Sequence, residues 1–354
     1  MSNDLIVTTG GGYKNRKDWI DLAKAIGIIL VVLAHALPKN TFIWKYIQQF
    51  HMPLFYIISG FLYSCKGTWL QYVKKKIKAL WMPFIGCGII MIVLKIIISF
   101  IVNHSIGITA KYVIKFFLML ELPPLQGATW FLSVLLYAMI VFDILIRGIH
   151  RFIKQNETIV IIIISIIVFI IGSNIALPYY TSHILVALSY IGVGYGLRRY
   201  EIYIEKVPIL ANIIVIFLIA GAAQINNVSV ALNSYTYKSV FFLIGIMGSI
   251  SVLSFCKKYE NRINIQYIKK QYEFLGKNTM GILIWQFVSF KLVMVIQVLV
   301  YKMSWKKLEN FPIIYEHNNM CWSILYTIVG VYLSIFIYKM LSQFAKAISK
   351  RCDD

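Results

Sequence analysis

Residues 158–172 read TIVIIIISIIVFIIG and contain no charged side chain. A helix needs roughly 20 predominantly apolar residues to cross the hydrocarbon core of a bilayer, which is about 30 Å thick. The whole chain shares this character, since its 354 residues are 59% hydrophobic and 14% charged, whereas soluble domains carry about 25% charged residues. The mean hydropathy is +0.74. We therefore predict an all-α fold, a polytopic bundle of transmembrane helices.

Ten apolar segments are candidates for membrane crossing. The composition argues against other broad classes, because the apolar content excludes disorder and the five cysteines show no paired spacing of a disulfide scaffold. The segments at 183–197 and 208–225 have the weakest pattern, since glycines and tyrosines dilute the first of them. The predicted spans are 19–37, 46–64, 81–102, 129–146, 158–173, 183–197, 208–225, 239–256, 279–300 and 320–340.

The basic residues are unevenly distributed between the two sides of these spans. The chain carries 35 Lys and Arg against 14 Asp and Glu, a formal charge of +21. In a soluble protein this excess would indicate nucleic-acid binding, but here the basic residues lie between apolar segments, so we expect no nucleic-acid partner. With the N-terminus inside, 24 basic residues fall on the inner side and 8 on the outer side. Because Lys and Arg concentrate in cytoplasmic loops, both termini are predicted to be cytoplasmic.

This topology predicts one membrane domain at 19–340, with cytoplasmic tails at 1–18 and 341–354. An alternative for the first span is a cleaved secretory signal, because Ala34-His35-Ala36 imitates its cleavage motif. Cleavage would invert the charge bias at every later crossing, so we interpret the first span as a retained helix.

Two further segments have the amphipathic pattern of helices that lie on a membrane surface. They read WLQYVKKKIKAL at 69–80 and AKYVIKFFLML at 110–120. The first has a lysine face, as expected of a helix on an anionic inner leaflet. The contact with membrane lipids is therefore predicted to extend beyond the spans themselves.

The first span carries three ionisable residues, Asp21, Lys24 and His35. Ionisable groups in the bilayer cost several kcal/mol and are functional candidates by default. At 100° per residue, the step from Lys24 to His35 falls about 20° from whole turns, so the two share a face and lie roughly 16 Å apart along the helix. The alternatives are a lysine that snorkels to the inner interface and a histidine at the outer interface.

The second span places His51 near the outer side, at about the depth of His35, with Pro53 in the first turn, where its missing N–H costs nothing. Two histidines at one depth suit a metal pair, a proton relay, or a catalytic base with its helper. Further ligands with useful spacing are absent from the sequence around them, so we predict no metal site.

Polar side chains also recur on two later spans. Trp130 and Ser133 share a face of the fourth span, and Asn278 and Ser289 share one of the ninth, with Gln286 adjacent. Such stripes are typical of helix–helix packing with polar contacts as well as of binding sites. Lys277 and Asn278 precede the ninth span at the inner side, where a helix N-terminus is either an anion site or a simple capped start.

Four stretches in order, DWIDLAKAIGIILVVLAHAL, FHMPLFYIISGFL, TWFLSVLLY and FLGKNTMGILIWQ, resemble the acyltransferase family 3 membrane proteins. The resemblance runs over most of the chain. Its most specific parts are the basic residue eleven positions before the helix-one histidine, with ten residues between them, and the His-Met-Pro motif. That family consists of ten-helix bacterial enzymes that move acyl groups, usually acetyl, from cytoplasmic acyl-CoA to hydroxyls of surface glycans or their lipid-linked precursors.

The resemblance implies roles for individual residues. The family's basic residue falls on Lys24, its helix-one histidine on His35, the His-Met-Pro histidine on His51, and the Trp-Phe-Leu tryptophan on Trp130. Many members have a Tyr-Leu-x-His pattern late in the ninth helix, where this chain has Ile-Trp-Gln ending at Gln286. Many members also carry arginine where this chain has Lys24. A lysine cannot bind a phosphate through two parallel hydrogen bonds, as an arginine guanidinium can.

The resemblance and the residues together predict a division of labour. His35 is expected to be the general base that takes the proton of a sugar hydroxyl, with His51 orienting it or stabilising the oxyanion. Acetyl-CoA is the expected co-substrate and a glycan or lipid-linked glycan the acceptor, at the bacterial cytoplasmic membrane. Predicted CoA-binding residues are Lys24, Lys74, Lys75, Lys76, Lys277 and Asn278, and predicted acceptor-binding residues are Trp130, Ser133, Trp44 and Glu121.

Two other functions fit parts of the pattern. A transporter or flippase for a glycan precursor would share the polar stripes and the outer aromatic residues, which are also typical of the aromatic belt of any membrane protein. It would not need an anion site at the inner side, and the inverted repeats common in transporters are not found in the sequence. A non-catalytic sensor or scaffold is the third alternative. The acyl chain, the acceptor, and whether the chain forms a homo-oligomer stay open.

Overall fold

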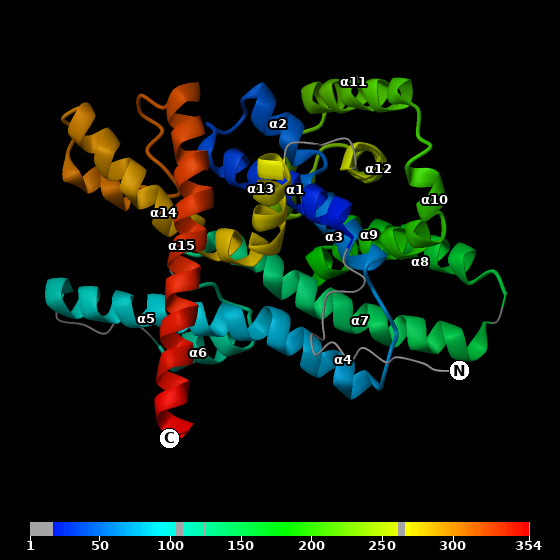
Figure 1. The fold of residues 1–354 in the computed structure, drawn as a ribbon, viewed down its shortest axis with the longest axis horizontal. Coiled ribbons are helices and arrows are strands. Elements are labelled where there is room, and N and C mark those ends of the chain that lie inside the picture. The colour runs from blue at the N-terminus through cyan, green and yellow to red at the C-terminus, as the bar shows by residue number, and fades with distance from the viewer. Residues whose placement is uncertain (1–16, 104–108, 124, 154, 261–265, 354) are drawn as a thin grey trace, which may run out of the picture.

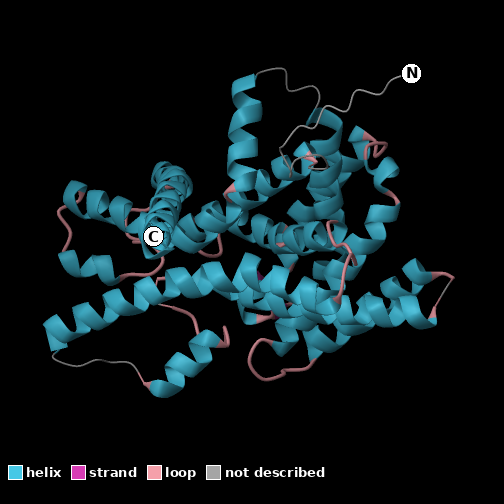
Figure 2. Cartoon of the chain, turned by 60° about the horizontal axis from the view of Figure 1, so that its bottom comes forward, coloured by secondary structure: helices cyan, strands magenta, loops and turns pink. Residues whose placement is uncertain are grey.

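The computed structural model describes residues 17–103, 109–123, 125–153, 155–260 and 266–353. It is 80% helical, and the only strands in these ranges are the two-residue β1 (Val228–Ser229) and β2 (Ser234–Tyr235), paired antiparallel. Figure 2 shows helices throughout, joined by short loops. The predicted all-α class is confirmed, while the first sixteen residues of the predicted N-terminal tail lie outside the described residues.

Each predicted span coincides with a helix. The agreement is closest where the apolar run is unbroken: the span predicted at 158–173 is α8 (Glu157–Asn174), and the one at 279–300 is α14 (Thr279–Val300). The others are α1 (Asp18–Ala36), α3 (His51–Phe61), α5 (Met82–Asn103), α7 (Trp130–Phe152), α9 (Thr181–Arg199), α11 (Ile209–Ile225), α12 (Lys238–Tyr259) and α15 (Met320–Asp353). Shorter helical elements connect them: α2 (Phe42–Gln48), α4 (Trp69–Lys76), η1 (Ile77–Trp81), α6 (Ala110–Phe117), η2 (Gly127–Thr129), α10 (Glu201–Ile204), η3 (Val230–Leu232), α13 (Gln266–Lys277) and η5 (Trp305–Glu309).

The second predicted span is interrupted in the structure. Residues 46–64 divide between α2 and α3, with a break at Gln49 and Phe50. The Gln49 side chain donates to the backbone oxygen of Asn226 at 2.9 Å, so the break is stabilised by a residue far along the chain. With a rise of 1.5 Å per residue, the 11 residues of α3 extend only about 16 Å. By itself, α3 is shorter than the hydrocarbon core.

The predicted surface helix at 69–80 is a helix, but it is not separate from the span that follows. It comprises α4 and the π-helical turn η1, which continue directly into α5, and Figure 1 shows one long rod beside α7. Thr68 caps the start through reciprocal hydrogen bonds with Gln71. Likewise, α15 continues to Asp353, so the predicted boundary of the C-terminal tail at residue 340 is not marked by a helix end.

Seven helices in the described ranges are long and apolar enough to cross a membrane, judged by length and composition. The three predicted spans outside this group are α3, α9 and α11, of which α11 is apolar but 17 residues long. The structure therefore confirms a polytopic helix bundle. The count of ten crossings and the cytoplasmic termini stay predictions.

Helix α1 lies at the centre of the bundle, in contact with α3, α12, α13, α14 and α15. Close helix–helix approach depends on glycines, since a Cβ on Gly60 of α3 would lie 1.9 Å from the carbonyl oxygen of Ile191 in α9. A Cβ on Gly194 of α9 would lie 2.1 Å from the carbonyl oxygen of Ile57. Small residues at such crossings let helix backbones approach, and here they hold α3, the helix that starts with His51, in a fixed position.

Candidate active site along helix α1

Two cavities lie beside α1, at different positions along it. The first, which we name the Lys24 cavity, has a volume of about 190 Å³. Its lining includes Lys24, Ser59 and Thr279, but most of it is apolar. The remaining lining residues are Ile28, Val31, Met52, Phe55, Ile58, Leu62, Leu80, Phe131, Leu132, Leu135, Met280 and Leu283. A chamber of this kind can hold a chain that is mostly apolar and present one cation at its end.

The second cavity, which we name the histidine cavity, has a volume of about 60 Å³. His35 and His51 both line it, together with Trp130, as the shared depth of the two histidines predicted. The lining also includes Gln48 and the segment 229–231, which lies in and beside the small β-hairpin. Ring nitrogens, an amide and an indole thus face one small space, which suits recognition of a hydroxyl-bearing molecule.

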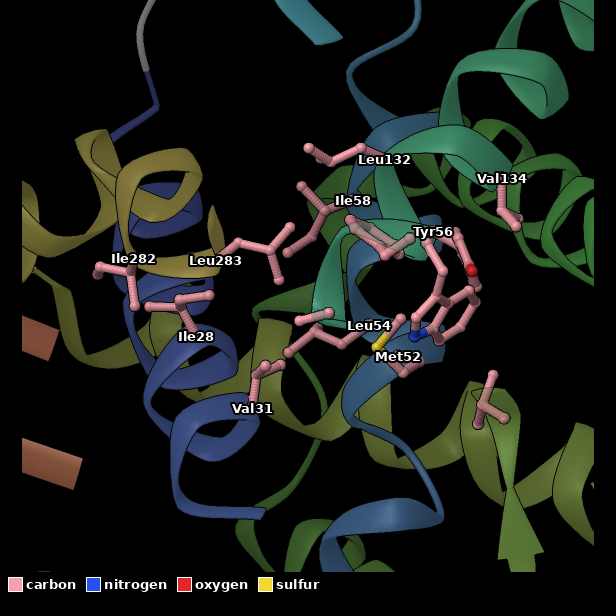
Figure 3. Packing of buried hydrophobic residues seen from close by; sticks show 14 of the residues in the cluster. Ile28, Val31, Met52, Leu54, Tyr56, Ile58, Leu132, Val134, Ile282 and Leu283 are labelled. Atoms are coloured by element: carbon pink, nitrogen blue, oxygen red, sulfur yellow. The ribbon is translucent and has the colours of Figure 1, made fainter. Parts of the chain in front are cut away.

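The two cavities share a wall of apolar side chains. Val31, Met52, Phe131 and Leu283 line both. Figure 3 shows Val31, Met52 and Leu283 approaching a common region from α1, α3 and α14. The Lys24 cavity and the histidine cavity are therefore neighbours along α1, with these four side chains between them.

The hydrogen bond of His51 defines its protonation. The ring is buried, with 5% exposed, and its Nδ1 lies 2.8 Å from the backbone oxygen of Ile47 at the end of α2. A carbonyl oxygen can only accept, so Nδ1 carries the proton and donates it. In the neutral imidazole this leaves Nε2 as an acceptor. The break between α2 and α3 places the Ile47 carbonyl at this position.

His35 is positioned by packing. Its ring is partly exposed and meets the ring of Phe287 edge-on, with centroids 4.9 Å apart. Phe287 belongs to α14, which therefore fixes the ring from the opposite side of the cavity. No protein hydrogen bond to a ring nitrogen of His35 is found within the described part of the chain, so its nitrogens are free to contact a ligand.

Lys24 forms an ion pair with Asp21 one turn earlier, at 2.9 Å. The Asp21 side chain is 2% exposed and the Lys24 side chain 23%. Pairing reduces the cost of a lysine in a low-dielectric region. Lys24 therefore both lines its cavity and has a partial charge balance, which differs from a lysine that only reaches the interface.

Three other predicted acceptor-binding residues do not line either cavity. Ser133 is fully buried, and its Oγ has no hydrogen-bond partner in the described structure. Trp44 packs on the small cluster of Ala34, Leu37 and Ile47. Glu121 forms an ion pair with Lys115 at 3.8 Å. Of this group, the structure places only Trp130 at the histidine cavity.

The remaining predicted CoA-binding residues lie outside the Lys24 cavity lining. Lys74 and Lys75 are exposed, and the Lys76 ammonium lies 5.3 Å from the ring centroid of Tyr72. Lys277 is paired with Glu273 at 3.0 Å. The Asn278 side chain donates to the backbone oxygen of Phe274 at 2.6 Å and does not cap α14. The two residues that follow Asn278, Thr279 and Met280, do line the cavity.

Several residues near the histidine cavity escaped sequence analysis. Gln48 and the segment 229–231 line it, yet no motif marks them. Gln126 is fully buried, and neither atom of its amide group has a hydrogen-bond partner in the described ranges. It lies two positions before Ala128, another lining residue. Gln286, which the sequence had marked as a polar residue of the ninth span, donates to Leu283 through Nε2, while its Oε1 has no partner in the described ranges. Buried amides without partners are rare.

Among the described residues, no group of three or more His, Cys, Asp or Glu side chains is arranged to hold a metal ion. The two histidines face a space lined otherwise by amide, indole and aliphatic groups.

A helical membrane bundle with Lys24 and His35 on the central helix α1, and with His51 on the neighbouring α3, defines a membrane protein with a buried polar site. The family model for an acyltransferase domain matches residues 17–339 of this chain. The chain therefore belongs to acyltransferase family 3, as the sequence motifs indicated, and is a membrane acyltransferase. Comparison with curated proteins and with solved structures found no match.

Proposed function

We propose that this protein moves an acyl group, normally acetyl, from cytoplasmic acyl-CoA to a hydroxyl of a cell-surface glycan or lipid-linked glycan precursor. The observation that carries the proposal is the pair of adjoining cavities, one apolar with Lys24 and one with His35 and His51, separated by a wall of four side chains. The proposed location is the bacterial cytoplasmic membrane, with both termini in the cytoplasm.

The Lys24 cavity suits the donor. The pantetheine arm of acyl-CoA is long, flexible and weakly polar, and it ends in the thioester, whereas the nucleotide end carries phosphates. An apolar chamber accommodates the arm, and Lys24 is placed to meet negative charge. The lysines of α4 and Lys277 add a positive field at the predicted inner side, which raises the local concentration of a polyanion. The arm then brings the thioester toward the shared wall.

The histidine cavity suits the chemistry. His35 takes the proton of the acceptor hydroxyl as its oxygen attacks the thioester carbon. The new C–O bond forms, the C–S bond breaks, and the proton passes from His35 to the departing CoA sulfur. Since Nε2 of His51 is an acceptor, we assign His51 to orienting the acceptor hydroxyl or the imidazole of His35, rather than to stabilising the oxyanion.

The cavities give less support to a flippase for a glycan precursor. Such a protein has to provide polar groups along the whole path of a sugar, because unsatisfied hydroxyl groups in an apolar surrounding are costly. The Lys24 cavity is lined mainly by aliphatic and aromatic side chains. It therefore fits an acyl-pantetheine arm better than a glycan.

The test is acetyl transfer in membranes that contain the protein. Membranes from expressing cells are incubated with acetyl-CoA labelled in the acetyl group, and the label is followed into lipid-linked and polysaccharide fractions. We expect incorporation that depends on the wild-type protein and disappears with His35→Ala at equal protein abundance. Equal incorporation with empty-vector membranes would refute acyl transfer by this protein, and unchanged incorporation with His35→Ala would refute the reaction as written.

A further inference from the structure

A third cavity, of about 390 Å³, lies between the α8–α9 connection and the β-hairpin. Its lining is polar, in contrast to the Lys24 cavity, and the side chains that matter here are Asn174, Ser182, His183, Asn233 and Lys238. We name it the Lys238 cavity. Its size falls in the range of about 300–1,000 Å³ that is usual for small-molecule sites.

The Lys238 cavity adjoins the histidine cavity. Residues 229–231 of the hairpin segment line the histidine cavity, and residues 232–235 line the Lys238 cavity. His183 lies between them, because its Nε2 is 3.2 Å from the backbone oxygen of Ala231. Its ring also meets that of Trp130 at 5.8 Å between centroids. The hairpin segment and the contact between the His183 and Trp130 rings thus lie between the Lys238 cavity and the histidine cavity.

His183 presents an unused acceptor. Because Nε2 faces a carbonyl oxygen, it carries the proton, which leaves Nδ1 as an acceptor in the neutral ring. This Nδ1 is buried and has no hydrogen-bond partner in the described structure. A buried acceptor of this kind calls for a ligand or water, and a sugar hydroxyl is a suitable donor.

Lys238 supplies the only charge in this lining. Its ammonium donates to the neutral amide oxygen of Asn174 at 2.7 Å, and no ion pair to Lys238 occurs within the described ranges. An ammonium has three donors, so donors remain for a ligand. Charge-assisted hydrogen bonds to an anion are stronger than those to neutral groups.

We propose that the Lys238 cavity binds a neighbouring unit of the acceptor glycan, a hydroxyl-rich unit that carries an anionic group, with that anion on Lys238. The inference rests on the proposed function, since it extends the acceptor site from the histidine cavity. A carboxylate of a uronic acid and a phosphodiester share the required chemistry. The hydroxyls of the unit meet His183 and the hydrogen-bonding positions that Ser182 and Asn233 retain beside their contacts to Ile175 and Gly172, and the adjacent unit reaches the histidines.

Binding of defined oligosaccharides to the detergent-purified full chain tests this proposal. The ligands are a hyaluronan tetrasaccharide with carboxylates, a ribitol-phosphate tetramer with phosphodiesters, and neutral N-acetylchitotetraose. We expect one anionic ligand to bind more tightly than the neutral one. Lys238→Gln should weaken that ligand about 10-fold, the size of a lost charge-assisted contact, and should leave the neutral ligand within about twofold. Lys238→Arg should retain binding.

Lys306→Gln is the matched control, because it removes the same charge from another exposed residue on the predicted outer side. It should leave all affinities within about twofold, which separates the cavity from general attraction to a basic protein. An unchanged affinity in Lys238→Gln, an equal loss for neutral and anionic ligands, or no saturable binding of any of the three would overturn the proposal. Acetyl-CoA affinity, measured in parallel, reports separately on the proposed function.

Discussion

The Lys24 cavity and the histidine cavity meet at one wall yet differ in chemistry. The first is largely apolar, with one lysine that is already paired to Asp21. The second is smaller and presents His35, His51 and Trp130. In the proposed function, the first space holds the acyl-pantetheine arm mainly by shape and burial, and the second positions the reacting hydroxyl. Substitution of Lys24 therefore alters the first cavity alone, and substitution of His35 or His51 alters the second alone.

The largest effect is expected at the histidine cavity. His35→Ala should lower the kcat of acetyl transfer about 10²–10⁴-fold, the usual contribution of a general base, and should leave acetyl-CoA affinity unchanged. His51→Ala should also lower kcat, but less. His150→Ala is the control, because His150 lies at the end of α7 in contact with Glu157 at 2.9 Å. Equal kcat values for the three variants in steady-state assays would remove the histidine cavity from the chemistry.

The shared wall should determine acyl length. Leu283→Ala enlarges the space between the cavities and should raise the ratio of kcat/KM for butyryl-CoA over acetyl-CoA about 10-fold, since each methylene is worth about 1–3 kcal/mol in such pockets. Ile282→Ala is the matched control, because Ile282 is fully buried but lines neither cavity. A ratio that changes equally in both variants would show that general loosening of α14, and not the wall, sets the preference.

A smaller effect is expected at the Lys24 cavity. Lys24→Ala should raise the KM for acetyl-CoA about 10-fold with little change in kcat, and Lys24→Arg should restore it, because the charge is retained. Lys291→Ala is the control, since the Lys291 ammonium is held by the backbone oxygens of Leu308 and Asn310. If Lys24→Ala and Lys291→Ala give the same KM for acetyl-CoA, Lys24 serves only to anchor the helix.

The smallest effect concerns the three lysines in the last turn of α4. Replacing Lys74, Lys75 and Lys76 together with glutamate should raise the KM for acetyl-CoA a few-fold at low salt. The increase in KM should become smaller as added salt screens the field. The same substitution of Lys302, Lys306 and Lys307, on the predicted opposite side, should leave KM unchanged. A KM that responds to both triple variants would indicate a general charge effect. A KM that responds to neither would argue against electrostatic capture of the donor.

The sequence predicts the parts of this protein that depend on local pattern. Unbroken apolar runs identify α8 and α14 to within a residue or two, and helical spacing places His35 and His51 at one depth. The break before α3 is not predicted by local pattern, because it is stabilised by a contact between Gln49 and Asn226, which are 177 positions apart. Nothing in a single segment reports such a contact.

Local contacts account for two predicted site residues that line neither cavity. Lys277 and Asn278 looked free in the sequence, but Glu273 and the Phe274 carbonyl, each four residues earlier on α13, engage them. The hairpin residues of the histidine cavity come from a loop that carries no motif. Motifs identified the residues on α1 and at the start of α3, whereas packing between distant segments determines which other side chains join them.

The most direct test of the central claim, that a CoA-bound acyl group passes from the Lys24 cavity to His35, is binding and turnover of acetyl-CoA by detergent-purified protein. Wild type and His35→Ala are compared, with CoA as the second ligand and helical content as the control for folding. We expect saturable micromolar binding by both proteins and thioester turnover by wild type alone. No binding by either folded protein would contradict the account and favour glycan transport.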